Sequence, residues 1–136
     1  MSDLASRVAE AFPLAQGGYP DGELTFMCDA VESQRPDFVA EWGTGSGCSG
    51  RIFWECSRLL GLNAAIHTIE LPDELQAFDT QHPGVNCGMY LSGDGDVVRH
   101  QGDGVTEALI LWKRLQPERP LFFLDGDHSQ IMVARE

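Results

Sequence analysis

A run of glycines directly after a short buried segment constrains this chain more than any other feature. The segment 38–42 has the length and apolar character of a strand, and Gly43, Gly45, Gly47 and Gly50 follow it within eight residues. Glycine adopts left-handed backbone conformations at no steric cost, so the pattern predicts a sharp turn from a strand into a helix. Such a turn leaves room for a ligand against the main chain and presents the free N–H groups of the helix to it.

Strand and helix patterns alternate along the chain. Helices are predicted at 4–12, 24–31, 52–60, 73–78 and 105–112, and strands at 38–42, 64–69, 96–101 and 121–124. This alternation predicts an α/β fold, in which a parallel sheet carries helices on both faces. In this class, ligands bind beyond the carboxyl ends of the strands.

Length and composition narrow the class of protein further. The 136 residues suit one domain, with a helical cap at 1–36 and a β-α-β core at 37–136. A net charge of −12 without any basic stripe argues against a nucleic-acid partner. No apolar stretch approaches the roughly 20 residues of a membrane helix. The four cysteines form no C-x-x-C pair, which favours reduced thiols and a cytoplasmic location.

Two cofactors fit the glycine run. Gly45, Gly47 and Gly50 satisfy the dinucleotide pattern G-x-G-x-x-G, and Glu70 follows at the end of the second predicted strand, where its carboxylate can bind a ribose diol. The other frame begins with an acid, Glu41, two residues before Gly43. A carboxylate beside the loop suits a ligand that bears an ammonium group, such as the methionine part of S-adenosylmethionine, better than it suits a pyrophosphate. We prefer this second frame.

The residues of the second frame resemble the first motif of class I methyltransferases, which use S-adenosylmethionine. The matching run is Val39-Ala40-Glu41-Trp42-Gly43-Thr44-Gly45-Ser46-Gly47. Glu70 resembles the second motif, and Gly102-Asp103 resembles the pair that closes the adenine end of the pocket. The resemblance implies a Rossmann-like fold of strand order 3-2-1-4, with Glu41, Gly43, Thr44, Gly45, Gly47, Glu70 and Asp103 at the cofactor. Asp103 is equally well explained as the N-cap of the next helix.

The segment after the fourth predicted strand, Asp125-Gly126-Asp127-His128, is a second candidate site. We interpret Asp125 and His128 as functional and Asp127 as a helix cap. The segment resembles a signature of cephalosporin-hydroxylase-like proteins and macrocin-type sugar O-methyltransferases. This resemblance implies that Asp125 binds Mg²⁺ beside the cofactor, and that His128 is the catalytic base for the substrate hydroxyl.

The chain departs from that subfamily beyond the fourth strand. The remaining metal ligands of the subfamily follow a fifth strand, whereas this sequence stops at Glu136, so the sheet is incomplete relative to the seven-stranded methyltransferase fold. A fragment, a degenerate domain and a site completed by a second chain all remain open. We expect little or no methyl transfer from this chain alone, and self-association through the open edge of the fourth strand.

The sequence therefore predicts a methyltransferase that uses S-adenosylmethionine, with Mg²⁺, to methylate a hydroxyl of a small molecule. A non-catalytic cofactor-binding module and an NAD-dependent oxidoreductase are the alternatives. Nothing in the sequence groups His67, His82 and His100 as ligands of one metal ion, so we assign them structural or surface roles. Trp54 and Trp112 lie on predicted helix faces and are expected in the core.

Overall fold

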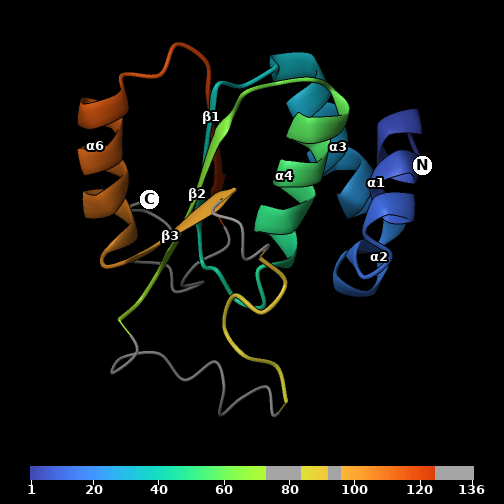
Figure 1. Ribbon diagram of the computed structural model, residues 1–136, viewed down its shortest axis with the longest axis horizontal. Coiled ribbons are helices and arrows are strands. Elements are labelled where there is room, and N and C mark those ends of the chain that lie inside the picture. Colours follow the sequence, from blue (N-terminus) through green and yellow to red (C-terminus); the bar gives the residue numbers. More distant parts are fainter. Residues whose placement is uncertain (73–83, 92–95, 125–136) are drawn as a thin grey trace.

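The computed structural model describes residues 1–72, 84–91 and 96–124. Within these ranges four parallel strands form one sheet of order β3-β2-β1-β4 (Figure 1). The strands are β1 (Phe38–Trp42), β2 (Ala65–Glu70), β3 (Val97–Gln101) and β4 (Pro120–Leu124). The predicted α/β class and the 3-2-1-4 strand order are both confirmed, and the sheet is Rossmann-like.

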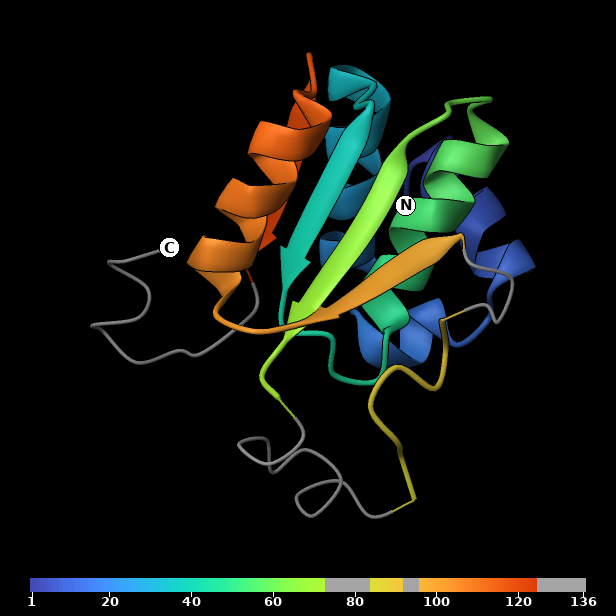
Figure 2. The same ribbon diagram turned by 60° about the vertical axis from the view of Figure 1, so that its left-hand side comes forward.

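Helices cover both faces of the sheet (Figure 2). One face carries α1 (Asp3–Ala11), α2 (Ala15–Gly18), α3 (Asp21–Gln34) and α4 (Cys48–Leu59), and the other carries α6 (Gly104–Leu115). The short α2 is not among the helices predicted from the sequence. The helix predicted at 73–78 lies outside the described residues.

Strand β1 is central and buried on both faces, and its side chains divide between two cores. Val39 joins the core beneath α1, α3 and α4, together with Leu24, Ile52 and Ile66. Phe38, Ala40, Trp42 and Ile69 meet Ala108 and Leu111 of α6 on the other face. This burial holds the carboxyl end of β1, from which the glycine loop begins, between two layers of helices.

Strand β4 differs from β1, although its sequence is just as apolar. It pairs with β1 along one edge, and no other described strand pairs with it. Phe122 and Leu124 are therefore exposed. The prediction that Trp112 lies in the core is wrong, because this side chain is exposed beside Phe122, while Trp54 is half-buried. Within the described ranges, no helix combines the length and apolarity needed to cross a membrane.

Candidate ligand site at the carboxyl edge of the sheet

The loop after β1 turns sharply because its glycines adopt left-handed conformations. Gly43 has a φ of 87°, and Gly47, which is the N-cap of α4, has a φ of 84°. The Gly43 N–H donates to the carbonyl of Ile69 at 2.8 Å, and the Gly47 N–H donates to the carbonyl of Thr44 at 2.7 Å. The loop is therefore anchored to β2 on one side and closed by a tight turn on the other.

Glu70, at the carboxyl end of β2, binds directly to this loop. Its Oε2 atom accepts hydrogen bonds from the N–H groups of Thr44 at 3.1 Å and Gly45 at 3.3 Å, and its Oε1 atom accepts from the N–H of Leu71 at 2.8 Å. The Thr44 hydroxyl is also bonded to the hydroxyl of Thr68 on β2, at 2.6 Å. Residues that the sequence places at two different strand ends thus form one connected group.

Glu41 supplies a second carboxylate, on the α4 side of the loop. Its side chain is fully buried beneath the first turn of α4. A Cβ atom at Gly50 would lie 3.1 Å from Glu41 Oε1, which is a tight contact, so glycine at this position makes room for the carboxylate. Burial and then the negative charge of Glu41 raise the pKa of Cys48 to about 11. The glycine loop therefore lies between two acidic side chains.

Asp103, at the end of β3, caps helix α6. Its Oδ1 atom accepts hydrogen bonds from the N–H and the hydroxyl of Thr106, at 2.9 and 2.8 Å. The N–H of the preceding residue, Gly102, donates to the carbonyl of Glu70 at 2.9 Å. The N-cap role predicted for Asp103 is confirmed. This backbone bond also places Asp103 next to the end of β2, while its predicted role at the adenine stays a prediction.

The segment 84–91 forms one wall of the loop, which the sequence does not indicate. The N–H groups of Gly88 and Tyr90 donate to the carbonyls of Gly45 and Ser46, at 2.8 and 2.9 Å. The Leu91 side chain fills the space that Cβ atoms at Gly47 and Gly50 would otherwise occupy. These two glycines consequently make room for a packed leucine, and this face of the loop is closed by protein.

Cys87 brings the same segment close to Glu70. The Cys87 thiol lies 4.0 Å from Glu70 Oε2 and 3.2 Å from the Arg99 Nη2 atom on β3. Cys87 is half-buried, whereas the other three cysteines are buried. No periodicity in the sequence signals these contacts, because they join segments that no secondary-structure pattern links.

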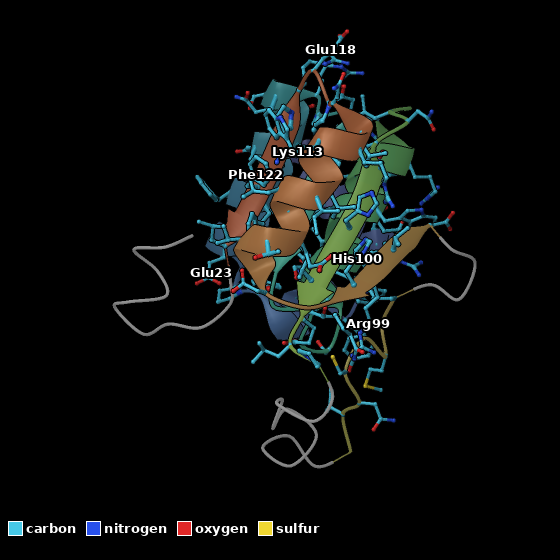
Figure 3. All side chains as sticks on the ribbon, turned by 90° about the vertical axis from the view of Figure 1, so that its left-hand side faces the viewer. Glu23, Arg99, His100, Lys113, Glu118 and Phe122 are labelled. Atoms are coloured by element: carbon cyan, nitrogen blue, oxygen red, sulfur yellow. The ribbon has the colours of Figure 1, made fainter. Side chains whose placement is uncertain are left out.

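His67 and His100 form a pair that the sequence analysis missed. They lie on neighbouring strands, and His67 Nδ1 is 2.8 Å from His100 Nε2. The ring centres are 5.1 Å apart, so the two nitrogens lie close to the line that joins the rings. This geometry is that of a hydrogen bond along the line between the two rings, rather than of two ligands converging on a shared metal. Figure 3 shows His100 on the β3 side of the molecule, away from Phe122 of β4.

The predicted metal and base residues, Asp125 and His128, lie outside the described residues. Among the residues that the structure describes, no three His, Cys, Asp or Glu side chains are grouped so as to hold a metal ion. The magnesium site and the catalytic base therefore remain predictions.

Comparison with known proteins identifies no family for this chain. No family model matches it, and no curated protein matches it. Among solved structures it is similar to an SAH-bound methyltransferase of Podospora anserina, with 18% sequence identity and a TM-score of 0.43. The match covers 93% of this chain and 51% of the other, so this chain spans about half the length of that protein.

Proposed function

We propose that this chain binds S-adenosylmethionine at the carboxyl edge of its sheet and is a methyltransferase domain for the hydroxyl group of a small molecule, with little or no methyl transfer expected from this chain alone. The observation that carries the proposal is the pair of carboxylates, Glu41 and Glu70, on either side of the glycine loop. A ligand with a sulfonium and an ammonium group is attracted to such a site, whereas a pyrophosphate is repelled by it.

The described residues fit the three parts of this cofactor. A carboxylate offers about four lone-pair positions. Glu70 uses three of them for the N–H groups of Thr44, Gly45 and Leu71, so it can still accept a hydrogen bond from one hydroxyl of a ribose diol. Glu41 and the loop would hold the methionine part, and Asp103 would lie at the adenine end. When bound, S-adenosylmethionine supplies an electrophilic methyl group on its sulfonium.

The remaining roles come from the resemblance of the segment 125–129. There His128 would take the proton of the acceptor hydroxyl, and Asp125 would bind a Mg²⁺ ion that lowers the pKa of that hydroxyl. The glycine loop and Glu70 would hold the cofactor close to the acceptor oxygen, which lowers the entropic cost of the transfer.

The rival dinucleotide pattern receives less support from the same geometry. A phosphate at this loop would need backbone N–H groups, and Glu70 already accepts those of Thr44 and Gly45. The third glycine of that pattern, Gly50, is explained by its packing against Glu41, Leu91 and Val97.

We expect S-adenosylhomocysteine to bind, and Glu70→Ala to weaken its binding by about 1–3 kcal/mol, because hydrogen bonds to the ribose are lost. Titration calorimetry with S-adenosylhomocysteine and with NAD, each with and without Mg²⁺, measures both affinities. Glu10→Ala is the matched control, since Glu10 is an exposed acid on α1, on the outer side of the molecule. Tight binding of NAD without any response to S-adenosylhomocysteine would overturn the assignment.

A further inference from the structure

The β4 side of the molecule carries a group of exposed apolar side chains from three elements. We call it the β4-edge patch. Its members and their exposed fractions are Phe26 (73%), Leu109 (55%), Trp112 (41%), Phe122 (40%) and Leu124 (49%). Exposed apolar side chains are unremarkable when scattered, whereas a contiguous group of them marks an interaction surface.

Three observations show that the patch is contiguous. The rings of Trp112 and Phe122 are stacked, with an interplanar angle of 17° and a centroid separation of 6.0 Å. Leu109 lies three residues before Trp112 and so shares that side of α6. On the other face of the sheet, Phe26 and Leu124 line the same groove, whose volume is about 330 Å³. The patch therefore borders β4 on both faces of the sheet.

The backbone of β4 adds hydrogen-bonding capacity to this apolar surface. Its inner edge pairs with β1, and no described strand pairs with its outer edge. Strand edges of this kind recruit another strand, and flanking apolar side chains strengthen that tendency.

The charge distribution favours a second copy of the chain over a strongly basic partner. Residues 1–72 contain ten acidic and four basic residues, whereas residues 96–124, which include α6 and β4, contain four of each. Contact through α6 and β4 joins electrically balanced segments, although α3, which contributes Phe26, also brings the acidic Glu23 to the groove.

We propose that the β4-edge patch is the interface of a two-fold symmetric dimer of this chain. A two-fold axis perpendicular to the sheet makes two identical edge strands antiparallel, so each β4 pairs with the β4 of the other copy. The same axis keeps both α6 helices on one face, where Leu109 and Trp112 pack across the interface. The proposed dimer forms without a ligand, and the observations behind it do not depend on the proposed enzymatic activity.

Sedimentation equilibrium over a dilution series tests the dimer. We expect Leu109→Lys and Leu124→Lys each to raise the dimer dissociation constant at least about tenfold, because each buries a charge at the interface. Ile110→Lys is the matched control. Ile110 is also half exposed, at 50%, but lies two residues from Trp112 and so on the opposite side of α6. The dimer dissociation constant of Ile110→Lys should match that of the wild type.

Amide hydrogen exchange gives a second measurement that does not need a variant to fold. In the dimer, the outward-pointing N–H groups of β4 should exchange more slowly as the protein concentration rises. Phe26→Lys, on the other face of the sheet, should weaken the dimer in the same way. A monomer at every concentration overturns the proposal. So does a monomer whose β4 amides are protected at every dilution, since another part of the chain, such as residues 125–136, then covers the edge.

Discussion

Replacing Gly104 with alanine is expected to lower the free energy of unfolding by about 2–3 kcal/mol, at the upper end of the usual cost of overpacking. Gly104 is the first residue of α6 and lies against the indole of Trp42, the last residue of β1, on the same face of the sheet. A Cβ atom at Gly104 would overlap the Cδ1 and Nε1 atoms of Trp42. The indole is buried and packed against Phe122, so it cannot move aside freely.

Urea unfolding of Gly104→Ala measures this cost. Gly22→Ala is the control, because Gly22 lies in α3 and a Cβ atom there would have no neighbour within 4 Å. It should leave the protein as stable as the wild type, or stabilise it by up to about 1 kcal/mol through helix propensity. Unchanged stability in Gly104→Ala would mean that α6 does not pack on Trp42 as described.

A smaller side chain at position 42 separates steric overlap from other causes. If overlap with the indole is the cause, Gly104→Ala should cost less in a Trp42→Leu background than in the wild type. The N-cap Asp103 precedes Gly104, so a displaced α6 should also weaken binding of S-adenosylhomocysteine. An equal loss of stability in the two backgrounds would mean that the substitution acts on the first turn of α6 itself and not through overlap with Trp42.

The parts of the fold that the sequence predicts well are those encoded locally. Strand β1 is buried on both faces, so four of its five residues are apolar, and the glycines that follow indicate the turn without further information. Glu70 is recognisable because it ends the next strand, and the parallel arrangement brings the two strand ends together.

The parts that the sequence does not predict depend on contacts between distant segments. His67 and His100 are 33 residues apart, and only the register of β2 against β3 brings their rings together. Leu91 packs on Gly47 from a segment without periodicity. Strand β4 is as apolar as a central strand, yet it lies at an edge of the sheet. The apolar sequence of a strand indicates that it packs against something, but it does not specify the partner.

Acidification from pH 6.5 to about pH 4.5 is expected to remove about 2–3 kcal/mol of the free energy of unfolding through His67. Burial, followed by the charges of His100 and Arg114, lowers the pKa of His67 to about 4. In the unfolded chain this pKa returns to about 6.5. Above that pH the imidazole is neutral in both states. Below it, the unfolded chain binds a proton that the folded protein does not, so stability falls with pH.

The charged and polar groups around His67 and His100 determine how strongly stability falls on acidification. Helix α6 places Arg114 and Glu107 near the rings, and β1 contributes only the apolar Phe38. Burial also lowers the pKa of His100, although Glu107 opposes this shift and Arg114 adds to it. His100 therefore contributes acid sensitivity of the same sign.

Urea unfolding at pH 7 and at about pH 4.5 measures the loss, and the His67→Phe variant accounts for the carboxyl groups that also begin to titrate in this range. His67→Phe should be less stable at pH 7, because the hydrogen bond to His100 is lost, but its stability should change much less between the two pH values. The remaining change reports His100 and carboxyl groups whose pKa is lowered in the folded protein, such as Asp37. An equal loss on acidification in the wild type and in His67→Phe would show that the acid-sensitive group lies elsewhere. Since the pair lies between the sheet and α6, the same acidification should expose the core around Leu111 to solvent before the core beneath α4.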